Sequence, residues 1–206
     1  MLKTIKENVS AEIVEKKSKF IANVFYIEST EEAENIIREM KKKYYDARHN
    51  CFAYSVYAED GIQNRYSDDG EPSGTAGSPM LNIITSRNLS NILVVVTRYF
   101  GGILLGTGGL VRAYTGAFQE ALNNVVEVNK DLGLEACLII EYSELEKVKY
   151  YFNQNDINIV DIVYDEKIKV IFEVTKEKYD TIIENKENLN FKYSDINIIK
   201  NKYIEV

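Results

Sequence analysis

Hydrophobic and polar positions in the first part of the chain predict a strand, a helix and then a hairpin of two strands. The segment "KFIANVFYI" at residues 19–27 has the composition of a strand, and Ser29 with Glu32 fits a capping box. Apolar residues then recur at helical spacing: Ala33, Ile36, Ile37, Met40 and Tyr44. Next, "NCFAYSVYA" alternates with the period of a strand and meets "IQNRYS" across Asp60-Gly61, a two-residue hairpin signal.

Two further helices and a buried strand are predicted before residue 126. Ser78 and Pro79 suit the N-cap and first position of a helix that runs to about Arg87. The segment "NILVVVTRYF" at residues 91–100 is almost entirely apolar, which is typical of a strand covered on both faces. One stripe of a long helix follows, formed by Leu110, Tyr114, Ala117, Phe118, Ala121 and Val125.

The last part of the chain has the pattern of a second small domain. Strand patterns occupy residues 135–142, 157–164 and 167–174, and a final strand ends the chain. Helices are predicted from Ser143, where Glu146 completes a capping box, and from Thr175. The order βαββαβ is that of the ferredoxin-like split unit, so both halves of the chain are predicted to be α+β.

Composition changes near residue 130. Ten of the eleven glycines and both prolines lie between Gly61 and Gly116, and the last glycine is Gly133. We therefore expect two domains, residues 1–130 and 131–206.

The charge is distributed unevenly between these two parts. The formal net charge is -7, but every arginine lies in the first 130 residues, whereas the rest of the chain holds ten lysines and sixteen acidic residues. Arginine suits phosphate recognition, so any phosphate contact is expected in the N-terminal part. Two distant cysteines, no signal peptide and no long apolar run predict a cytoplasmic protein that does not enter a membrane.

The glycine-rich segments do not match the common nucleotide-binding motifs. "GGILLGTGGL" lacks the lysine of a phosphate loop and the third glycine of a dinucleotide fingerprint. This segment and "GEPSGTAGSP" both lead into a helix start, where free N–H groups favour an anion. The candidate anion or nucleic-acid contacts are Arg98, Gly101, Gly102, Gly106, Gly108, Gly109, Arg112, Gly74, Thr75 and Lys19, and Lys16 and Lys17 extend the patch. Alternatively, the glycines only supply positive φ angles and close packing.

Other chemistry-bearing residues fit structural roles better than catalysis or metal binding. Asp68, Asp69 and Glu71 do not have calcium-loop spacing, and acidic turn residues commonly bond their own backbone. His49 and Cys51 lie two residues apart on a strand, too far for a direct hydrogen bond. We therefore expect no catalytic residues, no metal and no cofactor.

Three segments together resemble the IMPACT family in its bacterial two-domain, YigZ-type form. They are "ARHNCFAY", "SDDGEPSGTAGSPML" and "VVVTRYFGGILLGTGGLVRAYTGA", and the resemblance covers about residues 15–125, with a weaker one beyond residue 133. It implies an N-terminal domain with the ribosomal protein S5 domain 2-like fold, similar to elongation factor G domain IV, and a ferredoxin-like C-terminal domain. Eukaryotic relatives are translational regulators that act through a partner of an initiation-factor kinase, whereas for bacterial members the resemblance implies only a role in translation or nucleic-acid binding.

The leading hypothesis is a non-catalytic cytoplasmic regulator that binds RNA, the ribosome or a translation-related protein through its N-terminal domain. One alternative is an enzyme that acts on a small phosphorylated ligand at the glycine loops, and another is a pure protein-interaction module. The sequence does not decide the oligomeric state.

Overall fold

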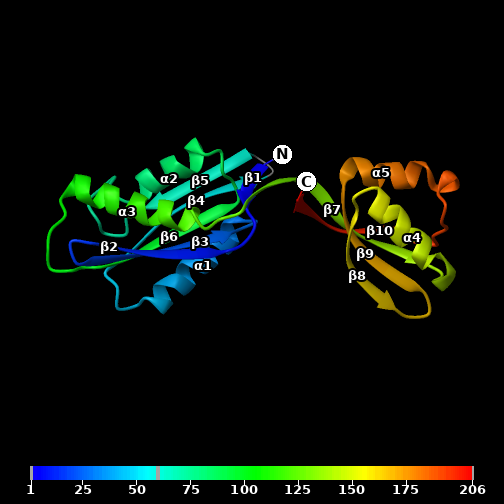
Figure 1. The fold of residues 1–206 in the computed structure, drawn as a ribbon, viewed down its shortest axis with the longest axis horizontal. Coiled ribbons are helices and arrows are strands. Elements are labelled where there is room, and N and C mark those ends of the chain that lie inside the picture. Colours follow the sequence, from blue (N-terminus) through cyan, green and yellow to red (C-terminus); the bar gives the residue numbers. More distant parts are fainter. Residues whose placement is uncertain (1, 59–60, 206) are drawn as a thin grey trace. The chain divides into compact units, whose positions relative to one another are not determined.

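The computed structural model describes residues 2–58 and 61–205 (Figure 1). The chain divides into two compact units, Leu2–Val128 and the residues from Asn129 onward. Both units contain a sheet with helices packed on it, so the predicted α+β, two-domain fold class is confirmed. The expected domain limits, 1–130 and 131–206, stay a prediction.

The N-terminal unit is built on an antiparallel sheet with helices on both faces. In spatial order its strands are β2 (Val9–Glu15), β3 (Ser18–Tyr26), β6 (Ile92–Tyr99), β4 (His49–Ala58) and β5 (Gly61–Ser67). Figure 1 shows α2 (Gly77–Ser86) and α3 (Thr107–Leu122) on one face, with α1 (Thr30–Lys43) on the other.

The central strand β6 supplies side chains to both layers, as its apolar sequence predicts. Val94 and Val96 pack into the cluster that includes Phe118 of α3. Leu93 and Val95 point the other way and join Ile37 of α1. Alternation along β6 thus separates two cores, and the prediction of a strand covered on both faces is confirmed.

Helix α1 begins where the sequence predicts. The Ser29 hydroxyl accepts a hydrogen bond from the Glu32 N–H at 3.1 Å. The Glu32 carboxylate reaches the N–H of Glu28 at 2.8 Å, one residue before the cap. The β4–β5 pairing closes at Ala58 opposite Gly61, but the predicted Asp60-Gly61 turn includes a residue outside the described ranges.

The C-terminal unit has the predicted ferredoxin-like strand order, β10-β7-β9-β8. Its elements are β7 (Glu127–Ile140), α4 (Leu145–Gln154), β8 (Asn158–Tyr164), β9 (Ile168–Thr175), α5 (Lys176–Glu184) and β10 (Asp195–Glu205). Short 3₁₀ turns occupy Tyr142–Glu144 and Lys186–Asn188. Strand β1 (Leu2–Ile5) belongs to the N-terminal unit. Side chains of α4 and α5 pack on one face of the sheet, around Phe152 and Phe172.

One helix start in this unit differs from the prediction. The Ser143–Glu146 capping box does not form, because a 3₁₀ turn precedes α4, whose N-cap is Glu144. The Glu144 carboxylate instead accepts from the N–H of Lys192 at 2.9 Å, a distant backbone group that local spacing cannot reveal. Thr175, by contrast, caps α5 by accepting from the Lys178 N–H at 3.3 Å, as predicted.

Each helix in the described ranges is too short or too polar to cross a bilayer.

We predict that the two cores unfold independently. Phe152→Ala removes a fully buried ring that packs against Phe172 at 4.7 Å between centroids. It should lower the stability of the C-terminal unit by about 3–5 kcal/mol. Native-state hydrogen exchange should show faster amides in residues 129–205 and unchanged protection in β3 and β6.

The matched control is Tyr150→Ala on the same helix, whose side chain is exposed. Equal loss of protection in both units would show that they share one cooperative core, which would contradict the two-domain organisation.

Candidate functional site

The loop between β5 and α2 is held by the carboxylate of Asp68. Its two oxygens accept hydrogen bonds from the N–H groups of Gly74 at 2.8 Å, Ala76 at 3.0 Å and Gly77 at 2.8 Å. These groups include the free donors at the start of α2, so Asp68 caps the helix from a distance. The expectation that acidic residues in this loop bond the nearby backbone is confirmed for Asp68.

Because Asp68 caps α2, two predictions about the loop before this helix are wrong. Helix α2 begins at Gly77 with Ala76 as its N-cap, so Ser78 and Pro79 lie inside the helix and do not start it. The anion expected near Gly74 and Thr75 is supplied by the chain itself. Thr75 is buried, and its hydroxyl donates to the carbonyl of Pro72 at 2.6 Å.

The same loop is pinned onto strand β4. The Asp69 carboxylate accepts from the N–H of Asn50 at 2.7 Å, and the Asp69 carbonyl lies 2.8 Å from His49 Nδ1. Because a carbonyl only accepts, Nδ1 carries the proton there. The Cys51 thiol donates to the Asp68 carbonyl at 2.9 Å. His49 and Cys51 therefore anchor the loop.

Glu71 lies at the centre of a buried polar network. Its Oε1 accepts from Arg98 Nη1 at 2.7 Å and from the Tyr114 hydroxyl at 2.8 Å. His49 Nε2 lies 4.0 Å from the same oxygen. The guanidinium of Arg98 also lies against the ring of Phe20, at 5.6 Å from its centroid. The network joins the loop to β6 and α3.

Burial sets the protonation states in this network. It raises the pKa of the Tyr114 hydroxyl, and the adjacent Cys51 and Glu71 raise this pKa further, so the phenol remains a hydrogen-bond donor. Burial also raises the pKa of the Cys51 thiol. Since the thiolate is the reactive form of cysteine, Cys51 is a weak nucleophile at neutral pH.

Arg98 is therefore not a surface cation, contrary to the expectation that it flanks an exposed anion site. It is buried and paired with Glu71 because an arginine inside an apolar strand needs a charged partner. This role of Glu71 was not predicted from the sequence. The signal was present in Arg98, a charge in an otherwise apolar buried strand.

The turn between β2 and β3 has an uncommon backbone conformation for its residues. Glu15 pairs with Ser18, which leaves Lys16 and Lys17 as a two-residue turn with φ angles of 46° and 65°. Such positions usually hold asparagine or glycine. Both lysines are exposed, and neither has an ion-pair partner among the described residues. The turn thus presents two cations at the cost of some backbone strain.

Gly101 packs against the β2–β3 turn and holds it in position. Its N–H donates to the Ser18 hydroxyl at 3.1 Å, and a Cβ at Gly101 would lie 2.0 Å from the carbonyl carbon of Lys17. Only glycine allows this approach, so the close-packing interpretation holds at Gly101. Gly102, by contrast, has a φ of +83° and open space where a Cβ would stand.

The start of α3 has free donors next to an unpaired arginine. Gly106 is the N-cap, with a φ of 71°, and no side chain caps the helix. The N–H groups of Thr107, Gly108 and Gly109 make no hydrogen bond within the described part of the chain. Arg112 Nη1 lies 3.6 Å from where a Cβ on Gly108 would stand. This guanidinium has no ion pair among the described residues, so it adds positive charge at the helix start.

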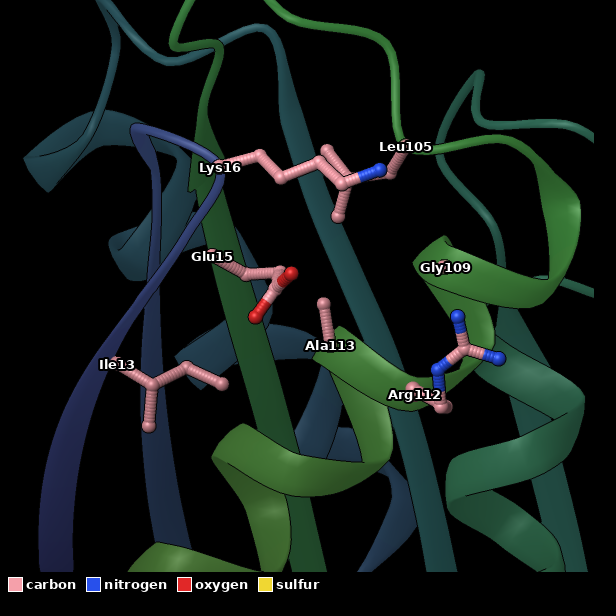
Figure 2. Close-up of a pocket in the computed structure, with 7 residues that line it drawn as sticks. All are labelled: Ile13, Glu15, Lys16, Leu105, Gly109, Arg112 and Ala113. Carbon is pink, nitrogen blue, oxygen red and sulfur yellow. The ribbon is translucent and has the colours of Figure 1, made fainter.

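A small hollow lies between the turn and this helix (Figure 2). Its volume is about 180 Å³, and its lining is Ile13, Glu15, Lys16, Leu105, Gly109, Arg112 and Ala113. In Figure 2, Lys16 extends across the mouth toward Leu105, while the carboxylate of Glu15 points into the hollow. Lys19 does not line it and pairs with Glu12 at 2.8 Å.

We call these groups the hairpin–helix surface, defined by Lys16, Lys17, Arg112 and the free N–H groups of residues 107–109. Of the predicted contacts, the structure brings Arg112, Gly108 and Gly109 together with Lys16. It places Arg98, Gly74 and Thr75 in the buried network or its loop. An arrangement of unpaired cations and free N–H groups can bind an anion.

Comparisons with known proteins cover both units. Residues 16–122 match the Impact N-terminal domain, and residues 138–185 match a domain of unknown function (DUF1949). IMPACT family member YvyE of Bacillus subtilis is 38% identical over 91% of this chain and 82% of that relative. IMPACT family member YigZ of Escherichia coli is 40% identical over 72% of this chain and 74% of that relative. A solved structure described only as that of a hypothetical protein aligns with a TM-score of 0.64 at 31% identity, covering 93% of this chain and 95% of that one.

We predict that the buried network is structural. Glu71→Ala leaves the Arg98 guanidinium and the Tyr114 hydroxyl without their shared acceptor. Loss of one partner of a buried ion pair costs about 3–5 kcal/mol, so urea denaturation should show the N-terminal unit destabilised by that amount.

The control is Glu15→Ala, which removes an exposed carboxylate and should change stability by less than about 0.5 kcal/mol. If Glu71→Ala were equally mild, Glu71 would be free for another role, and catalysis would again be a candidate.

Proposed function

This chain belongs to the IMPACT family, and from that premise we propose that it is a non-catalytic regulator of translation. It acts in the cytoplasm by binding RNA, the ribosome or a translation-related protein through the hairpin–helix surface. The resemblance to the family implies the connection with translation, since the eukaryotic relatives are translational regulators.

The difference between the starts of α2 and α3 is the observation that favours the hairpin–helix surface as the binding site. The helix start of α2 is filled by the chain's own carboxylate, whereas the start of α3 is open and has Arg112 beside it. The strained turn at Lys16 and Lys17 adds cations on the other side of the hollow. Strain at exposed charged residues is often retained for function, which supports a binding role.

The absence of catalysis is part of the proposal and is supported by how the polar groups are used. Glu71 already accepts from two donors, and the thiol of Cys51 has a raised pKa and bonds a carbonyl. Groups that satisfy one another in the interior are not available to a substrate. Regulation by binding requires no such groups.

We predict that removing two cations weakens binding in a salt-dependent way. The double variant Lys16→Ala and Arg112→Ala should reduce co-sedimentation with purified ribosomes across a potassium chloride series. For a single-stranded RNA contact, each phosphate contributes about -0.7 to the slope of log K against log salt. The variant's slope should therefore be flatter by about one to two units.

The matched control is Lys42→Ala with Lys43→Ala, which removes the same charge from the end of α1 on the opposite face of the sheet. Equal affinities and slopes for the two double variants, both folded by circular dichroism, would contradict the assignment of the surface.

A further inference from the structure

Exposed aliphatic side chains lie on the loop beside the charged hairpin–helix surface, and this combination of charged and apolar groups indicates the class of partner. Resting on the proposed function, we infer that the surface takes an acidic protein segment with apolar side chains, and not a nucleic-acid strand. The segment places a carboxylate at the start of α3 and an apolar side chain on the adjoining loop.

Exposed apolar side chains adjoin the hollow on the loop that leads into α3. Leu104 is 83% exposed, and the next residue along the chain, Leu105, lines the hollow. Ile103, the residue before Leu104, is 42% exposed. Exposed aliphatic groups that share one place on a protein mark a contact with another apolar surface.

A nucleic-acid strand suits these side chains poorly. Proteins that hold single strands stack the bases on aromatic faces, and aliphatic side chains have no such face. Phe100 is exposed beside this loop, but its ring already lies against the guanidinium of Arg98, at 5.5 Å. The exposed aliphatic residues Ile103 and Leu104 have no role on an RNA-binding surface.

A carboxylate of this surface also opposes a phosphate backbone. Glu15 points into the hollow, which Lys16 and Arg112 also line. A continuous row of phosphates would meet this negative charge as well as the cations. A protein segment can place one carboxylate at Arg112 and present a backbone N–H group to Glu15. Complementarity of this kind gives specificity in protein recognition.

The position of Arg112 fits a single carboxylate. Its guanidinium lies over the first turn of α3, where the N–H groups of Thr107 and Gly108 make no hydrogen bond to any described residue. A planar guanidinium binds a carboxylate with two parallel hydrogen bonds, and the helix start supplies further donors. The apolar contact at Leu104, next to Leu105, lies within reach of a neighbouring side chain of the same segment.

Fluorescence anisotropy with the full chain and three labelled probes tests this inference. The probes are a Glu-rich peptide with leucines at helical spacing, the same peptide with serine in place of leucine, and poly(U) RNA of equal charge. Wild type should bind the leucine peptide about tenfold more tightly than the other two probes, a difference of about 1.4 kcal/mol. Leu104→Ser should remove most of that preference.

The matched control is Tyr45→Ser, which removes a side chain of similar exposure just beyond α1 and should leave the preference unchanged. Tighter binding of poly(U), with no effect of Leu104→Ser, would overturn the inference and leave the proposed function in place. Binding that is insensitive to both Leu104→Ser and the Lys16/Arg112 double variant would overturn the inference and the proposed surface together.

Discussion

The buried ion pair between Glu71 and Arg98 determines how the N-terminal unit is assembled. Arg98 belongs to the central strand, Glu71 to the loop before α2, and Tyr114, which donates to the same oxygen, to α3. A buried charge needs a partner of opposite sign, and this pairing together with the Tyr114 hydrogen bond holds the three elements against one another. The position of α3, and with it the position of its free N–H groups, follows from this constraint.

The two helix starts of this unit are used in opposite ways. At α2, Asp68 supplies the negative charge that the helix dipole favours, and the loop becomes a rigid part of the fold. At α3 no carboxylate among the described residues takes this position, and glycines leave the backbone open. The two glycine-containing loops therefore differ in role: the loop before α2 is fixed by its own hydrogen bonds, whereas the loop before α3 leaves its helix start exposed. The same contrast separates Arg98, which is committed to Glu71, from Arg112, which is not.

Hydrophobic periodicity predicted most strands of both sheets and the helices that cover them, because alternation and helical spacing are local properties. It did not predict β1 and β2, the first two strands of the chain. The Ser29 and Thr175 caps were predictable for the same reason. The wrong or missing parts depend on partners far apart in the sequence. Ser78 was predicted to cap α2, but in the folded loop the Asp68 carboxylate accepts hydrogen bonds from the N–H groups at the start of this helix. Arg98 looked like a surface cation because its partner, Glu71, lies 27 residues away, and the role of Gly101 depends on a turn 83 residues earlier.

Amide hydrogen exchange of the full chain, with and without purified ribosomes, tests the central claim most directly. That claim is that the hairpin–helix surface is open for binding while the Asp68–Glu71 loop is closed by its own contacts. The free amides of Thr107, Gly108 and Gly109 should exchange quickly alone and slowly in the complex, together with those of Lys16 and Lys17. The amides of Gly74, Ala76 and Gly77 should be protected equally in both states, since Asp68 holds them. Protection that arose at residues 68–77 or only in the C-terminal unit, with residues 107–109 unchanged, would contradict the account.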